Sequence, residues 1–270
     1  MKTYKRTFAP NGKLLIFSVL IFSVFTLKAQ QGNDVMFKKT IVRAIDLREK
    51  QNEGIFSKNK EITKWILDAV LNGEVKPYTS DSLCEVQPMS VFSNSLKIPN
   101  SGTSFNPNNP TDTVDAYLAY GEDWRDYIMP SVQYSARDLY QLELKEEVFF
   151  DKNKSTMKYK VLAVTIYIPA DHPSNLKGIQ LPLASFDYQE LVEKVFSNSN
   201  AIWYNTQNEA QHKNLAEAFE LRLFSSYIIK VGNAKDAYLA DIYKDQHKGI
   251  MASQWAAMEL LEYEHNLWEF

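Results

Sequence analysis

The sequence predicts an α+β protein with helices near its N-terminus, a central antiparallel hairpin and helices near its C-terminus. Two runs rich in Val, Ile, Tyr and Phe flank a polar turn in the second half of the chain, which is the pattern of a hairpin. Apolar residues recur at helical spacing on both sides of it. The 270 residues are 45% apolar and 23% charged, which suits a globular chain that buries its own core.

Residues 1–29 are expected to be a signal peptide. Basic residues between Lys2 and Lys13 precede the apolar run from Leu14 to Leu27. This run would reach only ~21 Å as a helix, less than the ~30 Å of a bilayer's hydrocarbon core. We therefore expect cleavage after Ala29 and export of the remainder, with an uncleaved anchor as the alternative.

The mature chain is acidic and has one cysteine. Residues 1–29 contain five of the 30 basic residues and none of the 33 acidic ones, so the remainder has a net charge of −8. This charge disfavours nucleic acid and anionic lipid as partners. Cys84 cannot form an internal disulfide bond, and we expect it to be buried and structural.

Residues 30–92 are predicted to form an N-terminal helical lobe. From Phe37 to Asn52, apolar residues are interleaved with charges at near-helical spacing. From Ile62 to Val70 they recur at i, i+3, i+4, i+7 and i+8, and Gly73 stands where a helix C-cap belongs. Two helices are therefore expected here.

Residues 93–115 are predicted to be a polar loop or linker before an α+β core in residues 116–270. From 93 to 113, 17 of 21 residues are Ser, Asn, Thr, Gly, Pro or Asp, too polar to offset the entropy of ordering. In the core, Leu142 to Phe150 and Met157 to Ile168 are the expected hairpin strands.

The rest of the core is expected to be one more strand and several helices. Ile179 to Phe186 is the expected strand, and Tyr227 to Ile229 is an apolar run that fits either type. Capping patterns at Asp187 and Thr206 each open an expected helix. A last helix begins near Met251 and places six residues on one stripe. They are Met251, Trp255, Met258, Leu261, His265 and Trp268.

The sequence shows no catalytic or metal-binding set. There is no glycine-rich phosphate loop and no nucleophile elbow. The histidines, none within five residues of another, are His172, His212, His247 and His265. An acidic cluster includes Glu143, Glu146, Glu147 and Asp151. Because lysines are interleaved with Glu143, Glu147 and Asp151, we expect these three to form a charged, solvated strand face rather than an acid and base pair. Asp241, Asp245 and His247 equally suit a solvated helix face, so we predict no enzyme activity, metal or cofactor.

Four segments together resemble the GldN/PorN family of Bacteroidetes. Ala44 to Asn52 is similar to the family's I-D-L-R-E-K-x-N stretch, and Lys145 to Lys152 is similar to its K-E-x-x-F-F-D-K hairpin. Phe219 to Lys230 and the terminal Glu264 to Phe270 match in the same order. The chain departs from the family pattern at Val148, where Trp is usual, which is typical of a divergent paralogue.

The resemblance implies a non-enzymatic protein of the type IX secretion and gliding-motility machinery in the periplasm. It implies assembly with an outer-membrane lipoprotein, the GldK/PorK protein, into a ring that contains many copies of the chain. It also implies contacts with the periplasmic part of the inner-membrane motor and core proteins. Two other readings remain open: a periplasmic hydrolase or ligand-binding protein, and a chaperone for exported cargo.

The terminal segment is the expected partner-binding site. Exposed aromatic side chains at Trp268 and Phe270 would be costly unless a partner covers them, and Glu264 and His265 lie beside them in the sequence. Packing of the same residues within the chain is the alternative.

Overall fold

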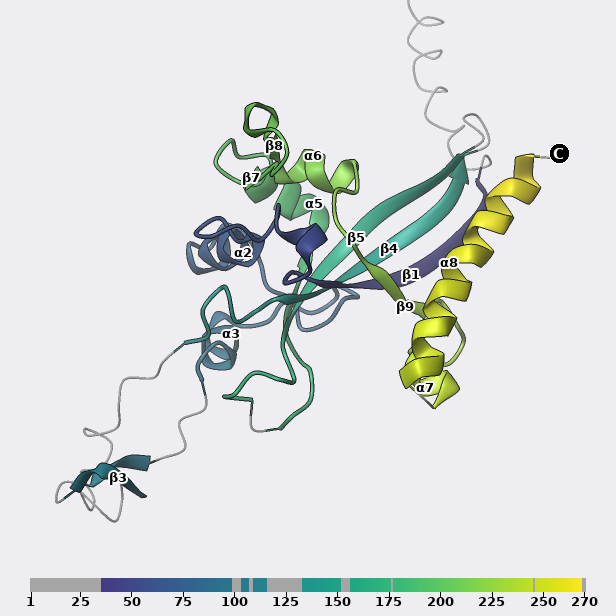
Figure 1. Ribbon diagram of the computed structural model, residues 1–270. Coiled ribbons are helices and arrows are strands. Elements are labelled where there is room, and N and C mark those ends of the chain that lie inside the picture. The colour runs from purple at the N-terminus through teal and green to yellow at the C-terminus, as the bar shows by residue number, and fades with distance from the viewer. Residues whose placement is uncertain are drawn as a thin grey trace, which may run out of the picture.

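The computed structural model describes residues 35–98, 103–106, 109–115, 133–151, 156–175, 177–244 and 246–268. Its centre is a five-stranded antiparallel sheet with the strand order β6-β5-β4-β1-β9 (Figure 1). Helices lie at both ends of this sheet, so the predicted α+β class is confirmed. The expected signal peptide at residues 1–29 lies outside the described residues.

The predicted hairpin forms the middle of the sheet. Its strands are β4 (Gln141–Asp151) and β5 (Thr156–Ile168), paired in register from Gln141 with Tyr167 to Asp151 with Thr156. The expected strand before Asp187 is β6 (Leu181–Asp187), and the apolar run of unassigned type is the edge strand β9 (Tyr227–Val231).

The first expected helix is instead the strand β1 (Val35–Asp46), followed by a short 3-10 turn, Lys50–Asn52. Ile41 and Ile45 point to one side of the strand, and Val42 is buried on the other. A strand buried on both faces mimics helical spacing over a short window, and pairing with β4 and β9 decides the outcome. Residues before and after the segment 93–115 therefore belong to one sheet. The predicted domain boundaries stay a prediction.

The remaining elements surround this sheet or form small pairs. The second expected helix is α2, and the last expected helix begins five residues earlier than predicted, as α8. Short pairs are β2 with β3 and β7 with β8. The bounds are α2 (Ile62–Leu71), α3 (Met89–Ser95), β2 (Thr103–Asn106), β3 (Asn109–Asp115), α5 (Tyr188–Leu191), β7 (Ile202–Trp203), β8 (Lys213–Asn214), α6 (Leu215–Glu220), α7 (Leu239–Tyr243) and α8 (Gln246–Trp268).

Only one of the two predicted capping patterns opens a helix. The Asp187 carboxylate accepts a hydrogen bond from the backbone N–H of Gln189 at 3.0 Å and caps α5. The pattern at Thr206 is not used. The helix expected there, α6, starts later, where Asn214 accepts from the N–H of Glu217 at 2.7 Å.

The predicted polar loop contains described structure at both of its ends. Its first residues finish α3, and β2 and β3 form an antiparallel hairpin within it. Residues 99–102, 107–108 and 116–132 lie outside the described residues.

The core consists of two apolar clusters on one face of the sheet. Alternate residues of β4 point to this face, and Leu142 and Leu144 join the first cluster whereas Val148 and Phe150 join the second. The first cluster lies under α2, α5 and α6, and the second under α7 and α8, at the other end of the strands (Figure 1). Glu146 stands between the two clusters on the same face.

Candidate partner-binding site

The last helix, α8, rests on the sheet through small side chains. Ala252 and Ala256 are buried, together with Leu260 one turn further on, against Ile41 and Ile228 of the second apolar cluster. Small residues bring the helix close to the sheet but bury little apolar area per residue. The helix is therefore held by a narrow inner face.

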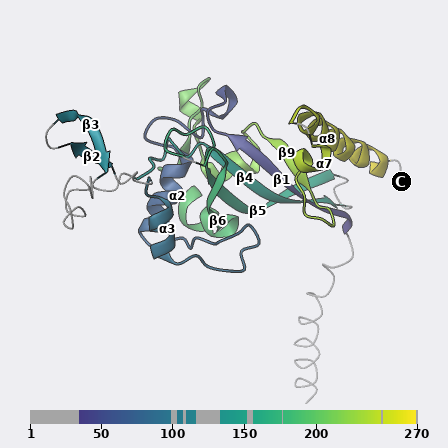
Figure 2. The same ribbon diagram turned by 90° about the horizontal axis from the view of Figure 1, so that it is seen from below.

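The helix α7 packs tightly against the first turn of α8. A Cβ atom at Gly249 would lie 3.2 Å from the Cα atom of Ala240, so glycine permits this close approach. Lys244 ends α7 with a φ of 53°, in the left-handed region that reverses a helix. Figures 1 and 2 both place this helical pair at the periphery of the molecule, beside β9.

The opposite side of α8 carries a stripe of large apolar side chains. The sequence predicted that most of them share a face, and the structure turns that face to solvent. Their side chains are 53–62% exposed. We call the following five residues the apolar stripe: Ile250, Met251, Trp255, Met258 and Leu261. Ile242 and Tyr243 of α7 are also exposed.

An exposed stripe of this composition is typical of a protein–protein contact. Large contiguous apolar patches are rare on soluble monomers. Tryptophan is enriched among the residues that dominate binding energy, and methionine adapts its shape to a partner. Side chains at positions i, i+4, i+7 and i+10 from Met251 are also the anchors with which a helix docks into an apolar surface.

Three of the four predicted partner-binding residues, Glu264, His265 and Trp268, lie in the last turns of this helix. Glu264 is half-buried and accepts a hydrogen bond from the backbone N–H of Met157 at 3.0 Å, so it fastens α8 to β5. His265 is exposed. Phe270 and the side chain of Trp268 lie outside the described residues. Partner binding by these four residues stays a prediction.

A buried ion triad lies on the sheet between the two apolar clusters. The Glu146 side chain is fully buried, and its carboxylate accepts from Arg43 Nε at 3.0 Å and from Arg222 Nη1 at 2.8 Å. Both guanidinium groups also lie over the ring of Tyr159. Burial lowers the pKa of Arg43, although the Glu146 charge opposes that effect. Glu146 belongs to the predicted acidic cluster, and the structure makes it the buried partner of two arginines.

A second carboxylate, Glu143, is buried on the other face of β4, so the expectation that it lies on a solvated strand face was wrong. Tyr167 donates a hydrogen bond to its Oε2 at 3.0 Å. Burial raises the pKa of Glu143 to about 7, and the charge of Asp81 adds to this effect. Positions 143 and 146 of a strand point to opposite faces, so these two carboxylates cannot act together as an acid and base pair.

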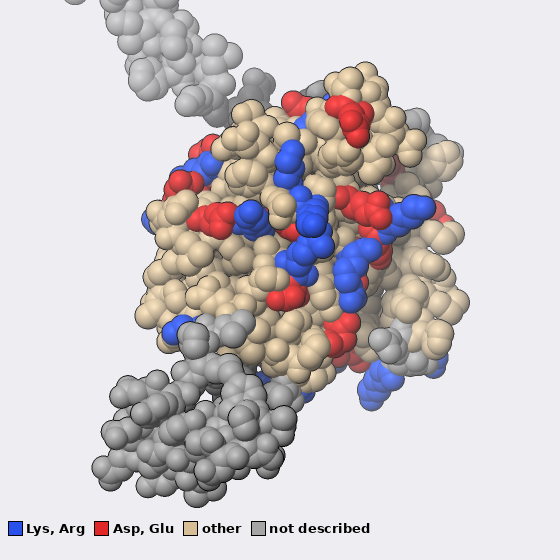
Figure 3. All heavy atoms as spheres, turned by 60° about the vertical axis from the view of Figure 1, so that its left-hand side comes forward, with Lys and Arg blue, Asp and Glu red and all other residues tan. Residues whose placement is uncertain are grey.

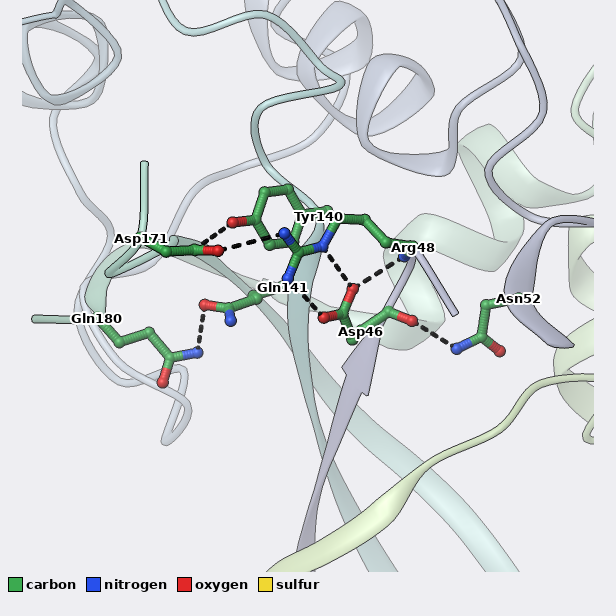
Figure 4. Close-up of polar contacts among 7 residues, drawn as sticks. All are labelled: Asp46, Arg48, Asn52, Tyr140, Gln141, Asp171 and Gln180. Atoms are coloured by element: carbon green, nitrogen blue, oxygen red, sulfur yellow. Dashed lines mark hydrogen bonds and ion pairs between the residues drawn. The ribbon is translucent and has the colours of Figure 1, made fainter. Parts of the chain in front are cut away.

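The start of the Ala44 to Asn52 segment forms a polar junction at the end of β1 (Figure 4). Arg48 Nη2 lies 2.9 Å from an Asp46 carboxylate oxygen, and its guanidinium lies 3.6 Å from the centre of the Tyr140 ring. Asp171 accepts from both Arg48 and the Tyr140 hydroxyl group. The side chains satisfy one another, which indicates a structural junction rather than an open binding site.

The described residues bear on three other possibilities: a metal site, a nucleic-acid interface and a membrane span. No group of three His, Cys, Asp or Glu side chains among them could hold a metal ion. Cys84, expected to be buried, is exposed, because it lies in the surface loop before α3. Figure 3 shows basic and acidic side chains next to one another across one face, unlike the basic stripe of a nucleic-acid binder. None of the helices in the described ranges is both long and apolar enough to cross a membrane.

Comparison with known protein families identifies the family of this chain. A search of curated proteins finds no similar sequence. The family model described as gliding motility associated protein GldN matches residues 30–269, which is most of the chain. The segments that resemble this family meet in the fold: Asn52 exchanges hydrogen bonds with the backbone of Ser225 at 2.7 and 3.2 Å, and Arg222 binds Glu146. The chain therefore belongs to the GldN family of gliding-motility proteins.

Proposed function

We propose that the protein is a non-enzymatic structural subunit of a periplasmic ring complex in the type IX secretion and gliding-motility machinery. In this role it assembles with an outer-membrane lipoprotein of the GldK/PorK type and with further copies of itself. Membership of a gliding-motility family supports the proposal. The single structural observation that carries it is the apolar stripe of α8, which an assembly would cover.

The proposed location is the periplasm, at the outer membrane through the lipoprotein. The basic and then apolar N-terminal segment supports export. Contacts with the periplasmic part of inner-membrane motor and core proteins belong to the same proposal. A ring needs at least two different contact surfaces on each subunit, because a single isologous contact closes as a dimer. The terminal residues Glu264, His265, Trp268 and Phe270 stay candidates for one of these contacts.

Purification of the tagged chain from its native envelope in mild detergent tests this function. We expect the lipoprotein to co-purify and the high-mass fraction to contain rings in negative-stain images. A paired substitution, Trp255→Ser with Met258→Ser, should reduce the high-mass fraction. The control is Ile179→Ser, which changes a side chain that is 57% exposed beside the opposite edge strand, β6. A tagged chain that elutes alone would contradict the proposal.

Two alternatives of other classes predict a different result. A periplasmic hydrolase or ligand-binding protein needs convergent catalytic groups, but Glu143 and Glu146 point to opposite faces of β4. A chaperone for exported cargo needs an exposed apolar groove, whereas the stripe lies on the convex surface of a helix. Both alternatives predict a monomer without a lipoprotein, so the same purification distinguishes them from the proposed function.

A further inference from the structure

The charges beside the apolar stripe have a direction along α8. Lys248 lies at the start of the stripe and Glu262 at its end, and both side chains are exposed. They are separated by 14 residues, which is ~21 Å of helix, and differ by only about 40° around the helix axis. A positive and a negative charge therefore flank the same side of the stripe, one at each end.

These two charges are available to a partner. Within the described part of the chain, neither Lys248 nor Glu262 takes part in an ion pair, whereas Glu259 lies 3.7 Å from Lys39. Any surface that covers the stripe therefore meets an unpaired positive charge at one end and an unpaired negative charge at the other.

We infer that the apolar stripe binds the apolar stripe of a second copy of this chain, with the two α8 helices antiparallel. In an antiparallel pair of helices, residues on the same side of the two stripes face each other. Lys248 of each copy then lies beside Glu262 of the other. A parallel pair would place like ends together and leave these charges unmatched.

The apolar residues match in the same arrangement. Trp255 lies midway between Lys248 and Glu262 in the sequence, so the twofold axis passes close to it. Met251 of one copy then meets Met258 of the other, and Ile250 meets Leu261. One register thus pairs every residue of the stripe and both charges with complementary groups.

The size of the stripe sets the expected strength of this contact. A 23-residue helix is ~34 Å long, and one of its faces buries less than the roughly 800 Å² per partner of a typical stable complex. We therefore expect a dimer that dissociates in the micromolar range. The contact is isologous and closes on itself, so it joins chains in pairs, and a ring built from these pairs needs a second, different contact surface.

Sedimentation equilibrium of the purified mature chain, without any partner, tests the pairing. The wild-type chain should reach the dimer mass as its concentration rises through the micromolar range. Lys248→Glu and Glu262→Lys should each raise the dissociation constant about tenfold, because each places like charges opposite each other twice. The double variant, Lys248→Glu with Glu262→Lys, should recover dimerisation, because it restores opposite charges at both ends.

A mixture of the two single variants gives the decisive result. Together they should form a heterodimer more tightly than either forms a homodimer, because every facing pair is then of opposite sign. Lys235→Glu, which changes an exposed charge in the turn after β9, is the control and should leave the dissociation constant unchanged. A chain that stays monomeric, or a double variant that stays as weak as the single ones, would overturn the inference.

The inference rests on the proposed function only in taking the stripe to be a protein–protein contact. The pairing of the stripes and the proposed function can be tested separately. If the purified chain is monomeric while the lipoprotein still co-purifies from the envelope, the pairing fails and the proposed function stands. If the chain forms the charge-dependent dimer but no lipoprotein co-purifies, the pairing stands and the proposed function fails.

Discussion

At the scale of single residues, Glu146 places a buried charge within the sheet. Its fully buried carboxylate is compensated by Arg43 and Arg222, so its removal leaves two guanidinium groups without their counter-charge. We expect Glu146→Gln to lower the free energy of unfolding by about 3–5 kcal/mol in urea titrations. The matched control is Glu147→Gln on the other face of the strand, where the partner Lys38 is exposed, and it should cost under about 1 kcal/mol.

Glu143 should give the folded protein an unusual pH dependence. Burial and Asp81 raise its folded pKa to about 7 from 4.5, although Tyr167, Tyr238 and Lys230 oppose the shift. Between these values the folded state binds more protons than the unfolded state, so stability falls as pH rises and the loss is complete above pH 7. We expect Glu143→Gln to remove this loss and to be relatively more stable at pH 8 than at pH 5, by about 1–3 kcal/mol. Urea titrations of the wild type and the variant at pH 5 and pH 8 measure this change. If the stability difference between the two proteins is the same at both pH values, the prediction is wrong.

At the scale of elements, one face of α8 packs on the sheet and the opposite face is exposed to solvent. Two residues adjacent in the sequence, Ala256 and Trp255, represent these two faces. Ala256 is buried against the sheet, whereas Trp255 points to solvent. Ala256→Glu should place an unpaired charge against the second apolar cluster and release the helix, with a loss of several kcal/mol. Trp255→Glu should leave the stability of the monomer within about 0.5 kcal/mol of the wild type. Limited proteolysis within α8 checks both variants, and Ala256→Glu should be cleaved there faster than the wild type. Fast cleavage of Trp255→Glu would contradict the assignment of Trp255 to the exposed face.

Sequence patterns predicted the elements whose contacts are local. The hairpin β4–β5 and the helix α2 follow from alternation and helical spacing within one window. The strand β1 was missed because its partner β4 lies about 100 residues away, and a two-sided buried strand resembles a helix over a few residues.

The candidate site was predictable only in part, for the same reason. The spacing of Met251, Trp255, Met258 and Leu261 placed them on one stripe, but only the packing of Ala252 and its neighbours shows which side faces solvent. The role of Glu146 could not be predicted, because it lies between the charged residues Lys145 and Glu147 and its two partners are distant in the chain.

At the scale of the whole molecule, the two apolar clusters differ in size, so the two ends of the sheet should differ in local stability. Among the described residues the first cluster has 28 buried members and the second has nine, two of which are alanines. Less buried apolar surface means a smaller free energy of local opening. We therefore expect native-state hydrogen exchange to give a lower opening free energy for the backbone amides of α7 and α8. The amides in the halves of β4 and β5 that lie beside α2 should give a higher value.

Pairing of the stripes adds a concentration dependence to this exchange. A partner that binds only the closed helix stabilises it by mass action, so exchange in α8 should slow as the protein concentration passes the dissociation constant of the dimer. Exchange in α2, which lies in the first cluster, should stay constant and serves as the internal control. Equal protection at both ends of the sheet would mean that the ion triad couples the clusters into one unit. Exchange in α8 that is independent of concentration would mean that the stripe finds its partner elsewhere in the assembly.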